Sequence, residues 1–224
     1  MKIIKRNKLR RSGFAGLRET RLVMSPKIFR GQQEAGTSVG IGRFVYLADA
    51  SFLPNGDTRM HTHRNIDVIS IMVAGRIQHE GSLHDGQELE VDSIQVQRAG
   101  EEGFSHNEIN PDAAKNRMIQ IWVIPENPDA PAVYQMFKAE PGKRKVVYGG
   151  SPDQDETIAG RTTIEIACVD AGTTIEHSGR CVVYQITGAG ESEEESLTEG
   201  DLVETWDFSF KASTESKLIL AYES

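Results

Sequence analysis

Residues 60–110 read MHTHRNIDVISIMVAGRIQHEGSLHDGQELEVDSIQVQRAGEEGFSHNEIN, and short runs in this stretch alternate apolar with polar residues. Two such runs are IDVISIMVAG (66–75) and SIQVQR (93–98), with Gly, Asn and Asp between and around them. A period of two indicates strands, and short strands at this spacing are typical of a β-sandwich or barrel. We therefore expect an all-β fold with little helix.

The same pattern continues on both sides of this stretch. Further runs are RFVYLAD (43–49), RMIQIWVI (117–124), TTIEIACV (162–169), RCVVYQITG (180–188) and KLILAY (217–222). A weak internal repeat relates the two halves, because the run that ends at Gly75 resembles the run that ends at Gly188. A chain of 224 residues is long enough for two barrels of roughly 100 residues each. We expect two stacked antiparallel β-barrels.

The segment from Pro125 to about Asp155 separates the two halves. It contains Pro125, Pro128, Pro131, Pro141 and Pro152, so it cannot be one regular strand. Apolar residues within it indicate that it packs against a core. We expect one barrel at 1–130 and a second barrel at 131–224, with residues 125–155 as the connection.

Charge and composition limit the possible partners. The formal net charge is −8 and the isoelectric point is about 5.3, so the chain as a whole repels a phosphate backbone, and we expect no nucleic-acid partner. The first twelve residues are basic and read MKIIKRNKLRRS. They are a basic arm or, as we favour, a solvated edge strand whose charges discourage pairing with other chains.

Targeting signals and cysteine usage indicate the compartment. No apolar segment follows the basic residues, and no stretch is long enough to span a membrane. We expect a cytoplasmic protein without a membrane partner. Cys168 and Cys181 stand in apolar strands, so two reduced, mostly buried thiols are a better interpretation than a disulfide.

Two pairs of polar residues stand at strand spacing. His61 and His63 flank Thr62, and His106 and Glu108 flank Asn107. Alternate residues of a strand point to the same face, and closing a barrel can bring one such pair opposite the other. Three imidazoles and a carboxylate suit iron, manganese, copper or nickel, with positions left for water or substrate. The competing interpretation is that these four residues are polar residues at the mouth of the barrel that bind no metal.

The other histidines carry weaker signals. His79 and His84 flank a predicted hairpin, and His177 stands alone. We interpret all three as surface residues. Moving His61 and His63 into the second half by the repeat offset places them at Thr174 and Glu176, with His177 on the opposite face. The C-terminal barrel should therefore lack a metal.

The region around residues 56–137 resembles the pirin family of the cupin superfamily. The resemblance rests on MHTH at 60–63, the hairpin around His84, AGEEGFSHNE at 99–108 and QIWV at 120–123. It implies a bicupin with one metal in the N-terminal barrel, held by His61, His63, His106 and Glu108. Iron(II) is the first expectation, and manganese, copper, nickel and zinc are alternatives.

The resemblance also implies a function. Bacterial pirins are associated with quercetin 2,3-dioxygenase activity, so we expect an oxidoreductase that binds a small aromatic substrate and O2, with Glu108 as a catalytic base as well as a ligand. The alternative is a non-enzymatic, iron-containing redox sensor that regulates a protein partner. Residues 13–29, GFAGLRETRLVMSPKIF, are a poor match to the family elements that normally help to shape the pocket entrance, and Asp67 replaces the usual glutamate.

Overall fold

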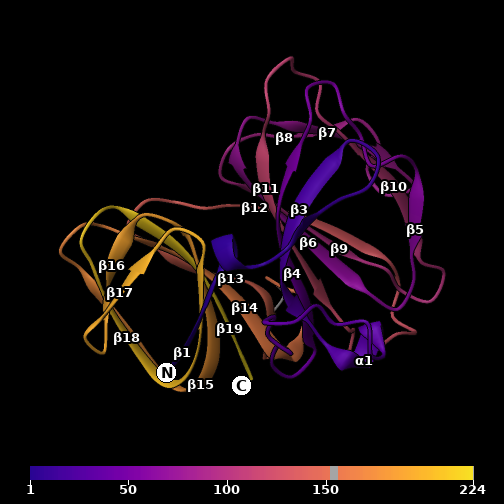
Figure 1. Cartoon of the computed structure of the whole chain (residues 1–224). Helices are drawn as coiled ribbons and strands as arrows, with labels where there is room; N and C mark the ends of the chain where they lie inside the picture. Colours follow the sequence, from indigo (N-terminus) through magenta and orange to yellow (C-terminus); the bar gives the residue numbers. More distant parts are fainter. Residues whose placement is uncertain (152–155, 224) are drawn as a thin grey trace.

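The computed structural model describes residues 1–151 and 156–223, and nearly all of their regular structure is strand (Figure 1). The helical elements described are the 3-10 turn η1 (Arg6–Lys8) and the short helix α1 (Pro26–Phe29). The strands are β1 (Lys2–Lys5), β2 (Arg11–Ser12), β3 (Leu17–Met24), β4 (Phe44–Phe52), β5 (His61–His63), β6 (Asp67–Ala74), β7 (Ile77–Gly81), β8 (Gln87–Leu89), β9 (Ser93–Arg98), β10 (Phe104–Ile109), β11 (Arg117–Val123), β12 (Val133–Lys138), β13 (Arg144–Gly150), β14 (Gly160–Val169), β15 (Thr174–Thr187), β16 (Ala189–Ser192), β17 (Glu195–Thr198), β18 (Asp201–Ala212) and β19 (Ser216–Glu223). The expected all-β class is confirmed.

The N-terminal half is built from two antiparallel sheets. A seven-stranded sheet has the order β12-β9-β6-β11-β4-β3-β2, and a four-stranded sheet has the order β5-β10-β7-β8. The long central strands β6 and β11 are buried on both faces. Ile71 and Ile119 belong to the core shared with the C-terminal half, whereas Met72 and Met118 pack with Ile77 of the four-stranded sheet. The period of two therefore places one face of each strand toward the second half and the other toward the inside of this half.

The C-terminal half is one sheet of eight strands. Its order is β13-β14-β19-β15-β18-β16-β17, and β1 pairs with β18 at one edge. The basic N-terminus is thus an edge strand, as we favoured, and it joins the sheet of the other half of the molecule. Lys2 pairs with Glu204, and Lys5 pairs with Asp201, so β18 supplies acidic partners for this basic strand.

The two halves share a strand order that the sequence repeat anticipates. In the N-terminal sheet β6 lies between β9 and β11, and in the C-terminal sheet β15 lies between β18 and β19. These are the strands that the repeat aligns, because Gly75 follows β6 and Gly188 follows β15. The weak sequence repeat therefore corresponds to a repeated sheet topology.

The proline-rich connection packs against both halves. Its β12 pairs with β9 in the N-terminal sheet, whereas β13 pairs with β14 in the C-terminal sheet. Residues 152–155, the end of the expected connection, lie outside the described residues. Strand formation on each side explains why this segment is docked although it is rich in proline.

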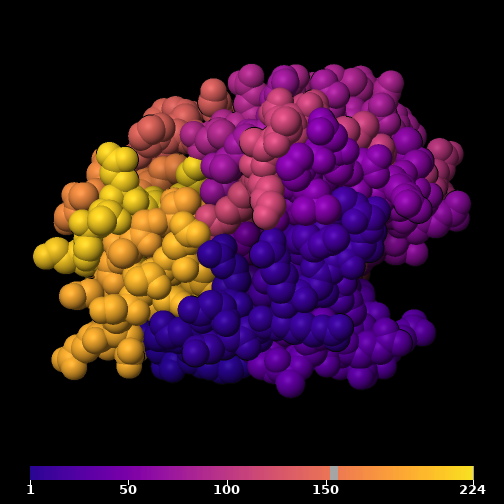
Figure 2. All heavy atoms as spheres, turned by 45° about the horizontal axis from the view of Figure 1, so that its top comes forward, coloured from indigo at the N-terminus to yellow at the C-terminus, as the bar shows by residue number. Residues whose placement is uncertain are grey.

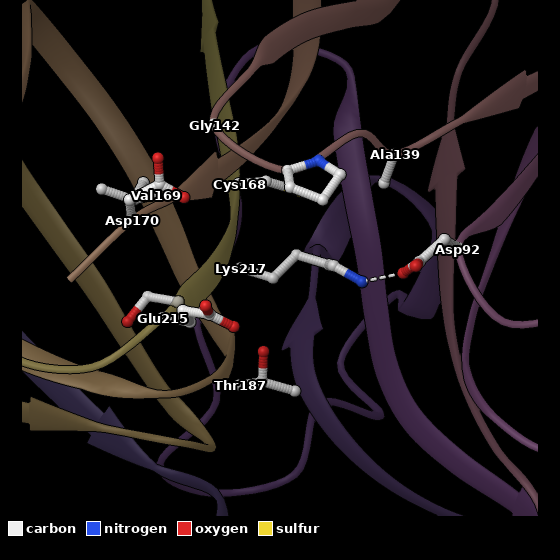
Figure 3. Close-up of a pocket in the computed structure, with 11 residues that line it drawn as sticks. Asp92, Ala139, Gly142, Cys168, Val169, Asp170, Thr187, Glu215 and Lys217 are labelled. Atoms are coloured by element: carbon white, nitrogen blue, oxygen red, sulfur yellow. Dashed lines mark hydrogen bonds and ion pairs between the residues drawn. The ribbon is translucent and has the colours of Figure 1, made fainter.

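Side chains join the two halves through buried contacts. The Tyr148 hydroxyl donates to Asp67 over 2.7 Å, and one continuous apolar core includes Ile71 of β6 and Ile219 of β19. Figure 3 shows Lys217 of β19 reaching across the junction to Asp92, with which it forms an ion pair at a cavity of about 260 Å³. The halves are thus packed together, not merely connected.

The cysteines are free thiols, as expected. Cys181 is buried among apolar residues, and Cys168 is half-buried at the cavity of Figure 3. Burial raises the pKa of both thiols, that of Cys181 to about 11. Both thiols therefore stay protonated near neutral pH. None of the helices within the described ranges is long and apolar enough to cross a membrane.

Candidate metal centre

The two sequence pairs meet because β5 and β10 are direct neighbours. These strands pair antiparallel, with His106 opposite His61 and Phe104 opposite His63. Gly103 allows this approach, because its φ is +78° and a Cβ there would lie 2.5 Å from the carbonyl oxygen of His63. The Gly-x-x-His spacing is thus a backbone requirement of the site.

Three imidazole rings converge on one point. The ligating atoms of His61, His63 and His106 all lie within 4.8 Å of one another. The Nε2 atoms of His61 and His106 are 3.1 Å apart, and the ring centroids of His63 and His106 are 5.0 Å apart. Among the histidines, cysteines and carboxylates of the described residues, these three histidines form the group that could hold a metal ion.

The protonation of these rings suits a metal. Burial, together with the neighbouring imidazoles, lowers the pKa of His63 to about 4 and that of His106 to about 2. Both rings are therefore neutral near pH 7, which is the form that ligates. His61 Nδ1 lies 2.9 Å from the carbonyl oxygen of Arg59, so the proton belongs on Nδ1 and Nε2 is left with its lone pair.

An unsatisfied buried atom supports the same fit. His63 Nε2 is buried and has no hydrogen-bond partner among the described residues. Buried polar atoms without partners are rare in proteins and call for an explanation. A metal ion bound by the three imidazoles would give this nitrogen a partner.

Glu108 lies beside the three histidines but is held by other groups. It is fully buried, its Oε1 accepts a hydrogen bond from the Ser70 hydroxyl over 3.0 Å, and its Oε2 accepts one from Gln120 Nε2 over 3.2 Å. Burial raises its pKa to about 7, against the effect of these two hydrogen bonds. The close group of ligating atoms does not include Glu108, so its part as a fourth ligand remains a proposal.

A cavity of about 330 Å³ opens beside His61, His63 and Glu108. Aromatic rings form much of its wall. Tyr46 and Trp122 stack with centroids 4.2 Å apart, and Trp122 and His63 meet edge to face with centroids 5.5 Å apart. The cavity is therefore suited to a flat aromatic molecule that reaches the three histidines.

Residues from the poorly matching N-terminal segment line the same cavity. They include Phe14, Glu19, Arg21 and Phe29. Glu19 is buried and accepts hydrogen bonds from the Tyr46 hydroxyl over 2.6 Å and from Arg21 over 2.7 Å. This segment therefore forms part of the cavity wall, although it matches the family elements poorly.

Our interpretation of His79 as a surface residue is wrong. His79 is fully buried, its Nδ1 lies 3.3 Å from the His84 carbonyl oxygen, and its ring centroid lies 5.5 Å from that of His106. The physical reason is the period of β7, where Ile77 and His79 point inward while Gln78 and Glu80 point outward. Ile77 two positions earlier was the signal that could have placed His79 inside.

The other two histidines lie outside the site. His84 is exposed and stacks on Tyr134 with centroids 4.4 Å apart. His177 is half-buried against Tyr222 in the C-terminal sheet, so it is less exposed than expected. Neither belongs to the group around His106.

Sequence reasoning also missed the residues that hold Glu108. Ser70, Gln120 and Trp122 lie on β6 and β11, and Trp122 Nε1 donates to Gln120 Oε1 over 3.2 Å. The signal available in the sequence was a polar residue, Ser70 or Gln120, within an otherwise apolar strand. Gln120 and Trp122 stand two positions apart, so they share a face that points into the cavity.

Sequence comparison identifies relatives of the chain. Residues 32–123 match the family model described as Pirin. A provisionally named quercetin 2,3-dioxygenase of Pseudomonas aeruginosa is 32% identical over 139 residues, which are 58% of this chain and 60% of the relative. A protein of Zymomonas mobilis with the same provisional activity in its name is 26% identical over 77% of this chain and 78% of its own. The chain thus spans less than two thirds of the first relative.

Structural comparison supports the fold over its full length. The crystal structure of the bacterial pirin YhhW from Escherichia coli in complex with nickel(II) has a TM-score of 0.84 at 16% identity, covering 98% of this chain and 97% of its own. A quercetin 2,3-dioxygenase from Acinetobacter baumannii has a TM-score of 0.74 at 17% identity, covering 100% and 86%. At these identities the likeness shows a shared fold.

Proposed function

From the Pirin domain that this chain carries at residues 32–123, we infer that it is a pirin-type, metal-dependent dioxygenase that cleaves a flavonol such as quercetin with O2. The provisional names of the relatives and the fold shared with a quercetin 2,3-dioxygenase support this proposal. The observation that carries it is the group of three histidines beside an aromatic cavity.

The proposed metal ligands are His61, His63 and His106, with Glu108 as the fourth. Iron(II) is our first candidate, and manganese, copper, nickel or zinc fit the same mixed nitrogen and oxygen set. The neighbour solved with nickel(II) supports a divalent transition metal in this fold. When bound, the metal would act as a Lewis acid that lowers the pKa of a substrate hydroxyl and orients it beside O2.

The cavity walls would hold the substrate. The stacked Tyr46 and Trp122 offer a flat apolar surface, and Phe14 lies opposite His61 with its ring centroid 6.4 Å from the imidazole. A flavonol is flat and aromatic, so it can contact these rings while a polar edge faces the histidines. These walls would also keep water away from the reacting carbons.

Glu108 is the proposed proton acceptor. Its carboxylate lines the cavity and has two hydrogen-bond donors, Ser70 and Gln120, that stabilise its charge and fix its position. A positioned carboxylate that takes the hydroxyl proton would leave the substrate as its anion, which is more easily oxidised. Ser70 and Gln120 would then keep the carboxyl group oriented through the reaction.

O2 uptake with a panel of flavonols tests this function. We propose that the protein is cytoplasmic. The full-length, metal-loaded protein should consume O2 and release carbon monoxide with quercetin, and the metal-free protein should not. If metal-loaded protein consumes no O2 with any flavonol, the dioxygenase proposal is wrong. The redox-sensing alternative, with its protein partner, would then be the better interpretation.

A further inference from the structure

A second cleft lies at the seam between the two halves of the molecule. Figure 2 shows the N-terminal residues, in indigo, along the boundary between the yellow C-terminal strands and the purple part of the chain. We name the cleft of about 320 Å³ at this boundary the seam cleft. Five cationic side chains line it, and these are Arg6, Arg11, Arg18, Lys115 and Arg117.

Two of these cations are held by a buried carboxylate, Asp49, and an exposed one, Glu199. Arg117 contacts Asp49 over 2.6 Å, and Arg6 forms an ion pair with the same carboxylate. Glu199, which follows β17 in the C-terminal sheet, lies 2.9 Å from Arg117 and 3.1 Å from Arg6. These contacts fix the position of two guanidinium groups at the back of the cleft and balance their charge.

The other three cations have no acidic partner among the described residues. Arg11 donates to the Ser51 hydroxyl over 3.2 Å, and Arg18 donates to the Leu17 carbonyl oxygen over 2.7 Å, which orients both side chains without neutralising them. Lys115 forms no ion pair with a described residue. The lining therefore carries a local excess of positive charge in a chain whose net charge is −8.

We propose that the seam cleft binds a small multivalent anion of the phosphate class. Guanidinium groups with fixed orientation form charge-assisted, paired hydrogen bonds with tetrahedral oxyanions, and a concave site strengthens these bonds by excluding water. A nucleic acid does not fit, because the chain as a whole has a net charge of −8 and would repel a long phosphate backbone.

The bound anion would lie beside the contacts that join the two halves. Arg11 and Arg18 belong to β2 and β3 of the N-terminal sheet, whereas Glu199, which holds Arg6 and Arg117, belongs to the C-terminal half. An anion that bridges the three free cations, which all belong to the N-terminal half, would lie beside this network. Because the anion binds only the folded protein, it raises the melting temperature by mass action.

The test compares inorganic phosphate and sulfate with sodium chloride at equal ionic strength. The metal-loaded, full-length protein should show a saturable rise in melting temperature with either oxyanion at low millimolar concentration, and calorimetric titration should give the matching affinity. Sodium chloride should produce no such rise, since its effect is screening alone. Sulfate matters here because it binds metals weakly, so an effect shared with phosphate does not come from the histidine site.

Two double variants locate the effect. Arg11→Gln with Lys115→Gln should weaken oxyanion binding at least about tenfold, because each lost charge-assisted hydrogen bond contributes to affinity. Lys138→Gln with Lys211→Gln removes the same charge from exposed positions outside the cleft and should leave affinity unchanged within about twofold. The proposal is overturned if wild-type protein shows no saturable effect, or if the first variant binds as well as the second.

Discussion

His61 contributes both geometry and chemistry at the scale of single residues. Its Nδ1 bond to the Arg59 carbonyl oxygen aims Nε2 at His106, so replacing the ring removes one proposed ligand without disturbing the core. We expect His61→Ala to lose most of its metal, with activity falling in step and partly returning at high added metal. Metal analysis and turnover of the same samples check this. His84→Ala, on an exposed histidine of the same half, should keep full metal content.

A substitution at Glu108 can distinguish its role as a metal ligand from its role as a catalytic base. Glu108→Gln keeps the size and one oxygen donor, and it can still contact Ser70 and Gln120. If Glu108 accepts the substrate proton, activity per bound metal should fall by roughly 10² to 10⁴, the usual effect of losing a positioned base. Equal activity per bound metal in variant and wild type would leave Glu108 no part in proton transfer. Glu90→Gln, at an exposed position, is the matched control.

Asp67 gives the protein a predictable dependence of stability on pH. Burial raises its pKa to about 6, although the Tyr148 hydroxyl and the Ala99 N–H both donate to it. The pKa of Asp67 is higher in the folded protein than in the unfolded chain, so its proton stabilises the folded protein. This stabilisation is fully present below about pH 4 and is lost as the pH rises through about 6. The loss is about 3 kcal/mol in the free energy of unfolding.

The substitution Asp67→Asn removes this dependence. The variant should gain stability relative to wild type between pH 4 and pH 7, by about 3 kcal/mol in the free energy of unfolding. Denaturant titrations of both metal-free proteins at several pH values measure the difference, so that metal release at low pH does not contribute. A constant difference across this range would contradict the assignment. Asp129→Asn, on an exposed carboxylate, should change little.

The N-terminal strand β1 is the element that connects the start of the chain to the other half. Ile4 is buried and lies opposite Leu202 of β18. Ile4→Ala should lower the free energy of unfolding by about 2 kcal/mol, the lower end for such core truncations because β1 is an edge strand. Lys2→Ala removes an exposed ion pair and should cost less than about 0.5 kcal/mol. Equal effects of the two substitutions, measured by denaturant titration, would mean that β1 is not packed as described.

The positions of the longer strands could be predicted well because their apolar content and period of two are local signals. The runs at 66–75 and 117–124 agree with β6 and β11, although both faces of these two strands are buried. The partners of short elements could not be predicted in the same way. The pattern of β1 shows an edge strand but not which sheet it joins, since any acidic edge would offer lysine partners. The pairing of β5 with β10 depends on chain closure, which a local pattern does not encode.

The whole molecule depends on contacts that no local pattern contains. Asp49 of β4 contacts Arg6, Arg117 and Tyr184, which come from the N-terminus, the first half and the second half of the chain. The same holds for the site: spacing placed three histidines correctly on one face, but the bonds of Ser70 and Gln120 to Glu108 arise only when separate strands meet. Sequence therefore predicts which residues face inward better than it predicts which of them touch.

An anomalous difference map from crystals of the protein purified without added metal tests the central claim most directly. With data collected at the absorption edge of the metal found by elemental analysis, we predict one peak per chain, within coordination distance of His61, His63 and His106. The map also shows whether Glu108 reaches the ion. No peak at these histidines in crystals whose protein contains metal, or a peak in the C-terminal sheet, would contradict the account.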